Sequence, residues 1–93
     1  MILNLILNHH YYNMVESGIK KEEYRRLCQH WRNRIWKNRD KITAVRFYKG
    51  YTSESMIFKV NSIRKGLGKE SLGAPSGEEV YIIAFSKHMT DND

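Results

Sequence analysis

The chain has 93 residues, 41% of them hydrophobic and 12% aromatic. This length suits one domain, residues 1–93, with a single thin core. The aromatic content excludes an intrinsically disordered chain. The formal net charge of +6 at pH 7 favours partners that carry negative charge.

The positive charge is concentrated in the first half of the chain. Residues 20–50 contain eleven Lys and Arg against three Asp and Glu, whereas the rest contains five basic and seven acidic residues. A clustered basic surface is typical of proteins that bind phosphate chains. The clustering therefore predicts a nucleic-acid partner, and a solvated surface without a ligand is the competing interpretation.

Compartment and assembly are indicated only broadly. The apolar run at residues 2–7 is too short for a membrane span and has neither the basic region nor the cleavage site of a signal peptide. Cys28 is the only cysteine, so no internal disulfide forms, which suits a reducing compartment. We expect a cytoplasmic protein without a membrane partner. The oligomeric state stays open, with a monomer favoured.

The first elements in chain order are a strand and a short helix. Residues 2–7 are apolar apart from Asn4 and predict a buried strand. Asn8 is a suitable N-cap for a helix over residues 9–17. Gly18 then stands where a helix ends in a left-handed residue. The side chains expected to face the core from this helix are Tyr11, Met14, Val15 and Tyr12.

A dense run of charges follows at residues 19–26, and we interpret it as an irregular strand, with a helix as the alternative. The two-residue period of a strand places alternate side chains on opposite faces. One face would carry Lys21, Glu23 and Arg25. The other would carry Lys20, Glu22, Tyr24 and Arg26.

Residues 27–38 predict an amphipathic helix. Leu27, Trp31 and Ile35 are spaced i, i+4, i+8, which is typical of a buried stripe. Trp31 is therefore assigned to the core. The other faces of this helix carry Arg32, Arg34 and Lys37.

The second half of the chain predicts strands. In residues 43–48, side chains expected in the core alternate with side chains expected to face solvent, which predicts a strand. Gly50 marks a turn, and residues 55–64 predict a further strand. Residues 65–79 contain four of the six glycines and predict a long loop. Residues 80–85 are apolar throughout and predict a strand buried on both faces, before a polar, frayed tail over residues 87–93. The fold class is α+β, a small mixed β-barrel with flanking helices.

One short motif could carry a site. Gly18, Lys20, Glu23 and Arg25 form the pattern G-x-K-x-x-E-x-R just after a tight turn. A Glu between a Lys and an Arg can orient both cations toward a phosphate or a base edge. The alternative is a salt-bridged surface strand that binds nothing.

This motif resembles the signature of ASCH domains, which belong to the PUA-like superfamily. The helix before Gly18, the Trp31 helix, the strand near Val45, the Gly73-Ala74-Pro75 loop and the final strand near Ile82 are also similar. The resemblance implies a small PUA-like barrel with a cleft lined by the motif. It further implies RNA as the favoured partner, in some members a modified base, with DNA as a second possibility.

The resemblance also implies an enzymatic alternative. Some small bacterial ASCH proteins hydrolyse N4-acetylcytidine with a Lys, a Thr and a Glu, and another branch has been linked to ribonuclease activity. Their Lys falls on Lys20, and their Thr falls on Glu23, which is not a hydroxyl nucleophile. If this chain is such an enzyme, Lys20 and Glu23 are the candidate catalytic residues, with Glu23 as a general base.

Aromatic residues alternate with cations between positions 24 and 51, a pattern suited to stacking single-stranded bases in a basic groove. The aromatic residues are Tyr24, Trp31, Trp36, Tyr48 and Tyr51, of which Tyr48 is the best stacking candidate. The candidate binding residues are Gly18, Lys20, Lys21, Glu23, Arg25, Arg26, Arg32, Arg34 and Tyr48.

No metal or cofactor is predicted. His9, His10, Cys28 and His30 are the residues that could suggest zinc, but they lack the regular pairs of a structural zinc site. His9 and His10 are better placed at the start of a helix. Cys28 is better explained as a small buried residue.

Overall fold

The computed structural model describes the backbone of residues 1–89 and the side chains of residues 1–86. Its elements follow one another along the chain as strands interrupted by two helices and two short 3-10 helices. In order they are β1 (Ile2–Leu7), α1 (His9–Glu16), β2 (Glu22–Arg26), α2 (Gln29–Arg34), η1 (Trp36–Asn38), β3 (Ala44–Lys49), β4 (Ser55–Leu67), η2 (Glu70–Leu72) and β5 (Glu79–Met89). Among these residues, no helix has the length and apolar character needed to cross a membrane.

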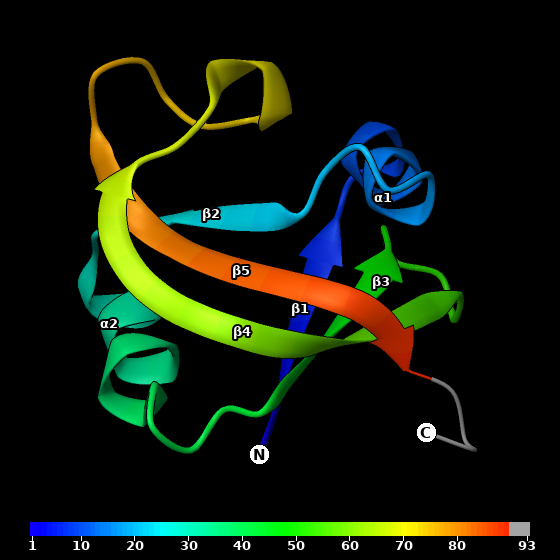
Figure 1. The fold of residues 1–93 in the computed structure, drawn as a ribbon, viewed down its shortest axis with the longest axis horizontal. Coiled ribbons are helices and arrows are strands. Elements are labelled where there is room, and N and C mark those ends of the chain that lie inside the picture. The colour runs from blue at the N-terminus through cyan, green and yellow to red at the C-terminus, as the bar shows by residue number, and fades with distance from the viewer. Residues whose placement is uncertain (90–93) are drawn as a thin grey trace.

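The five strands form one mixed sheet in the order β1-β3-β4-β5-β2. The β1–β3 pair is parallel, and the other three pairs are antiparallel. The long strands β4 and β5 curve strongly, so the sheet curls into a half-barrel (Figure 1). A compact α+β fold with a barrel-like sheet is thus confirmed.

The inner face of the curled sheet holds the main core. Leu3, Leu5 and Leu7 of β1 are 2–4% exposed, whereas Ile2 and Ile6 on the other face are 45–46% exposed. The expected strand over residues 2–7 is therefore confirmed, but only one of its faces is buried. Three phenylalanine rings from β3, β4 and β5 pack together in this core, with centroids 5.0–6.0 Å apart: Phe47, Phe58 and Phe85.

The helix after β1 forms as its sequence predicts. Asn8 Oδ1 accepts a hydrogen bond from the amide of Tyr11 at 2.9 Å, which caps the first turn. Tyr12 and Val15 are the buried side chains of α1, whereas Tyr11 and Met14, which were also expected to face the core, are only half-buried. Gly18 has a φ of +84°, a left-handed conformation that other residues adopt at a cost. The chain reverses here and enters β2.

The prediction of a single helix over residues 27–38 is wrong in extent. Pairing of Arg26 with Val80 keeps the chain extended, so α2 begins only at Gln29 and is followed by a separate 3-10 helix. Leu27 consequently lies outside the helix and is 39% exposed, whereas Ile35 is completely buried. The prediction that Cys28 is buried is also wrong, because Cys28 lies exposed in the bend between β2 and α2.

The long loop is shorter than predicted. Lys65, Gly66 and Leu67 pair with β5, because β5 starts at Glu79 and both strands continue together through this stretch. The remaining link, residues 68–78, places Leu72 and Ala74 in a second small core. The predicted burial of residues 80–85 on both faces is confirmed for all of them except the half-buried Ala84. β5 also includes residues 87–89 of the expected frayed tail, and residues 90–93 lie outside the described part.

Candidate functional site

The G-x-K-x-x-E-x-R motif lies where the chain passes from α1 into β2. The amides of Ile19 and Lys20 both donate to the carbonyl of Met14 at 3.0 Å, which folds the turn back against the helix. This turn directs the side chain of Lys20 inward, toward Glu23, and not to the opposite face that a strict two-residue alternation predicts. The motif therefore forms one polar cluster.

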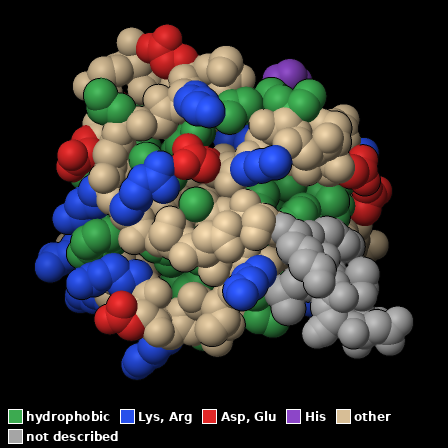
Figure 2. Space-filling view, in the orientation of Figure 1, with side chains coloured by type: hydrophobic (Ala, Val, Ile, Leu, Met, Phe, Trp, Pro, Cys, Tyr) green, Lys and Arg blue, Asp and Glu red, His purple; other side chains and the backbone are tan. Residues whose placement is uncertain are grey.

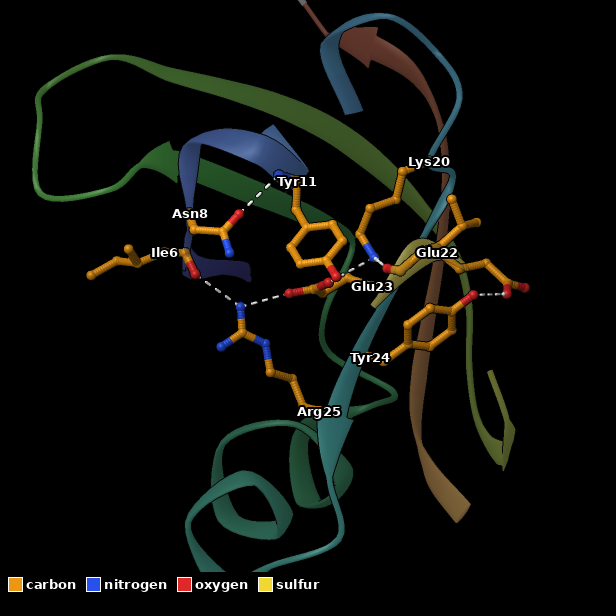
Figure 3. A network of polar contacts seen from close by, with 9 residues as sticks. Ile6, Asn8, Tyr11, Lys20, Glu22, Glu23, Tyr24 and Arg25 are labelled. Carbon is orange, nitrogen blue, oxygen red and sulfur yellow. Dashed lines mark hydrogen bonds and ion pairs between the residues drawn. The ribbon is translucent and has the colours of Figure 1, made fainter. Parts of the chain in front are cut away.

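Lys20 is the most enclosed member of this cluster and is 1% exposed. Its Nζ lies 3.2 Å from Glu23 Oε1 and donates to the carbonyl of Leu72 in the roof loop, residues 68–78 (Figure 3). The same Nζ lies 4.6 Å from the ring centroid of Tyr24 and 5.2 Å from that of Tyr11. Burial lowers the pKa of Lys20, and the carboxylate of Glu23 opposes that shift. Lys20 is thus covered by protein.

Glu23 connects the two cations. Its Oε2 accepts from Arg25 Nη2 at 2.7 Å, and its side chain is 8% exposed. The same Nη2 of Arg25 donates to the carbonyl of Ile6 on β1 at 3.0 Å, and Arg25 Nε is buried without a partner in the described part of the chain. Glu23 therefore holds Arg25 across the open side of the half-barrel, between the edge strands β2 and β1. We call Lys20, Glu23 and Arg25 the Lys20 cluster.

A second arginine reaches the same edge from α2. Arg34 Nη2 donates to the carbonyl of Asn4 at 2.9 Å. The Cζ atoms of Arg25 and Arg34 lie 4.8 and 5.3 Å from the ring centroid of Trp31. Trp31 is only partly buried, so its assignment to the core interior is corrected: it packs at the margin of the core, beside two cations.

These side chains surround a pocket of about 540 Å³. The pocket lies between β1, α2 and the turn that joins β3 to β4. Tyr51 in that turn is 96% exposed. The lining residues are Asn4, Leu5, Ile6, Arg25, Trp31, Arg34, Tyr48, Gly50, Tyr51 and Thr52. Three of the predicted binding residues, Arg25, Arg34 and Tyr48, are brought together here.

The other predicted residues lie elsewhere. Arg26 lines a pocket of about 270 Å³ beside Pro75. Gly18, Lys20 and Lys21 line another of about 250 Å³ between α1 and β5. Arg32 is exposed on α2 and lines none of these three pockets.

Sequence reasoning missed two kinds of pocket residue. Trp31 and Tyr51 are both part of the predicted alternation of aromatic residues and cations, but neither was among the candidate binding residues. The helical spacing of Trp31 favoured a place in the core over a place in the pocket. Asn4 and Ile6 on β1 also line the pocket, but no sequence pattern marks them as binding residues, because β1 contributes to the pocket as an edge strand of the sheet. Only the order of strands in the sheet reveals that edge.

Within residues whose side chains are placed, no three His, Cys, Asp or Glu lie together as a metal site would require. Comparison with protein-family models, with curated proteins and with solved structures finds no significant match.

Proposed function

We propose that this chain is a nucleic-acid-binding module of the ASCH, PUA-like kind, which receives one base of a single-stranded RNA in the pocket beside Trp31. Single-stranded DNA is the alternative ligand. The motif at the α1–β2 turn and the curled sheet support the family proposal. The exposed Cys28 suits a reducing compartment such as the cytoplasm, where we propose that the module acts as a monomer.

The observation that carries this proposal is the composition of the pocket wall. Two arginines lie against Trp31, and the exposed ring of Tyr51 also lines the pocket. Aromatic rings beside cations are the usual means of holding an unpaired base next to its phosphate. A volume of about 540 Å³ also lies within the range of small-molecule sites.

The polar groups of the pocket are fixed before any ligand arrives. Glu23 and the Ile6 carbonyl both hold Arg25, and the Asn4 carbonyl holds Arg34. A preorganised guanidinium loses little conformational freedom when it binds a phosphate or a base edge. This arrangement favours recognition by Arg25 and Arg34 over loose electrostatic attraction.

Burial of Lys20 and Glu23 favours binding over hydrolysis. A general base must come within hydrogen-bond reach of the atom that it deprotonates. Lys20 and Glu23 are 1% and 6% exposed, and neither lines the pocket beside Trp31. Their position suits orienting Arg25 better than attacking an acetylated base.

The test is binding of labelled RNA and DNA oligonucleotides across a salt series. We expect Tyr51→Ala to weaken binding by about 1–3 kcal/mol, because one stacked base is lost. Arg34→Gln should weaken binding as well and reduce the salt slope by about one phosphate contact. Tyr51 is almost fully exposed, so its replacement leaves the fold intact.

Lys59→Gln is the matched control, because Lys59 is exposed on β4 and outside the pocket. It removes one positive charge and should leave base preference unchanged. If neither RNA nor DNA binds the wild-type protein at low salt, the proposal is wrong. Release of acetate from N4-acetylcytidine by the wild-type protein, lost in Glu23→Gln, would instead support the hydrolase.

A further inference from the structure

A second tryptophan, Trp36 at the start of η1, lies among cations. The Cζ of Arg39 lies 4.3 Å from the ring centroid of Trp36, and the Nζ of Lys65 lies 4.6 Å from it. The indole itself stacks on Tyr81, with centroids 5.6 Å apart and ring planes 22° from parallel. Arg39 Nη1 also donates to the carbonyl of Trp36 at 2.8 Å. We call Trp36, Arg39 and Lys65 the Trp36 cluster.

No carboxylate neutralises this pair of cations within the described part of the chain. The ion pairs found there involve Lys20, Arg25 and Arg64. Asp40, although next to Arg39 in the sequence, is exposed and forms no ion pair among the described residues. Two exposed cations held over one ring repel each other, and an anion between them relieves that repulsion.

The Trp36 cluster lies close to the pocket beside Trp31. Arg25, Tyr81 and Lys65 are register partners on the adjacent strands β2, β5 and β4. The strands that carry Arg25 and Lys65 are therefore two spacings apart, roughly 10 Å. In Figure 2, Lys and Arg side chains gather at the left, where Figure 1 places α2 and the curve of β4.

We propose that Arg39 and Lys65, held on Trp36, bind a backbone phosphate of the same strand whose base enters the pocket beside Trp31. This inference rests on the proposed function and extends it from one nucleotide to a short strand. A separation of roughly 10 Å exceeds the 3.4 Å rise of one stacked nucleotide and the larger phosphate spacing of an extended single strand, so the cluster meets a phosphate beyond the nucleotide in the pocket. The cluster then sets affinity for the chain, while the pocket sets preference for the base.

The experiment compares a nucleoside 5′-monophosphate with a dodecanucleotide of the same base on wild type and on Arg39→Gln/Lys65→Gln. We expect the double variant to bind the dodecanucleotide about tenfold or more weakly, with a salt slope smaller by about two, because two phosphate-neutralising charges are lost. The nucleoside monophosphate should bind both proteins equally, since it fills the pocket without reaching Trp36.

The matched control is Lys59→Gln/Lys69→Gln, which removes two exposed charges that lie over no aromatic ring among the described residues. If Arg39→Gln/Lys65→Gln weakens the dodecanucleotide no more than this control does, the Trp36 cluster is not a phosphate site, although the pocket can still bind a base. A wild-type protein that binds polyglutamate through Arg39 and Lys65, but no nucleic acid, would overturn this inference and the proposed function together.

Discussion

The Lys20 cluster and the Trp36 cluster use similar residues for opposite purposes. In the first, Glu23 lies between two cations and all three side chains are largely buried. In the second, Arg39 and Lys65 are exposed, held by an aromatic ring, and unpaired with any carboxylate among the described residues. A cation that is buried and paired stabilises one conformation, whereas an exposed and unpaired cation can bind a ligand.

This difference shows why the motif alone does not locate the binding surface. Lys20 is bound to Glu23 and covered by the Leu72 carbonyl, so it contacts no solvent to speak of. Its contribution reaches the pocket only through Glu23, which orients Arg25. The strongest sequence signal therefore marks the support of the pocket and only one member, Arg25, of its lining.

The largest expected effect comes from removing the negative charge between the buried cations. Glu23→Gln leaves Lys20 and Arg25 enclosed without their counter-charge, so we expect the free energy of unfolding to fall by about 3–5 kcal/mol. A domain of this kind is stable by only about 5–15 kcal/mol. Urea denaturation monitored by tryptophan fluorescence measures the loss.

The double variant Lys20→Met/Glu23→Gln separates charge from shape. Because no buried ammonium group is left at position 20 without its carboxylate partner, part of the lost free energy of unfolding should be recovered. We expect a coupling of about 1–3 kcal/mol between the two sites. Arg39→Gln should change unfolding by less than about 0.5 kcal/mol, as an exposed surface substitution does. Equal losses in Glu23→Gln and Arg39→Gln would contradict the comparison.

The next effect concerns the roof loop that covers Lys20. A Cβ on Gly68 would lie 2.6 Å from the ring of Tyr24 and 2.7 Å from the Cβ of Ala74. We expect Gly68→Ala to displace the loop and to destabilise the fold by about 1–3 kcal/mol, as overpacking does. Urea denaturation gives the loss, and faster acylation of the Lys20 amine would report the opened roof.

Gly66→Ala is the control for this substitution. Gly66 lies two residues earlier, and its added Cβ would meet only Ile82 Cδ1 at an ordinary 3.4 Å. Its effect should therefore be well below that of Gly68→Ala. If the two variants unfold at the same urea concentration, close packing of the roof on Tyr24 is not what covers Lys20.

Local patterns predicted most of the elements. The strand over residues 2–7, the Asn8 cap and the Gly18 turn formed as expected, because each depends on neighbours in the chain. The helix starting at Leu27 did not form as expected. Leu27 follows β2, and the pairing of Arg26 with Val80, 54 positions away, holds the chain in β2 up to the residue before Leu27.

The site was predicted only in part for the same reason. Contact between Glu23 and its neighbours on β2 follows from the motif, because the spacing is short. The bond from Arg25 to the Ile6 carbonyl depends on β1 and β2 facing each other, which no local pattern encodes. The stack of Trp36 on Tyr81 joins residues 45 positions apart and is equally invisible in the sequence.

The smallest expected effect compares two neighbours on β4. Arg64 Nη2 lies 2.8 Å from Glu22 Oε2, and this hydrogen bond lowers the pKa of Glu22 below its usual 4.5, whereas Lys65 has no such partner in the described chain. A carboxyl whose pKa falls on folding adds stability above its unfolded pKa and loses it as pH falls through the folded pKa. Both side chains are partly exposed, so we expect a contribution of about 0.2–1 kcal/mol.

Arg64→Gln should therefore destabilise the protein near neutral pH, and its difference from wild type should shrink as the pH falls below about 4.5. Lys65→Gln removes the same charge one residue later and should follow the wild-type pH dependence. Urea midpoints measured over roughly pH 3 to 7 test both variants. If the two variants respond to acid alike, the pH dependence comes from net charge and not from the Glu22 pair. The contrast between paired and unpaired cations would then not hold for Arg64 and Lys65, which are consecutive residues of β4.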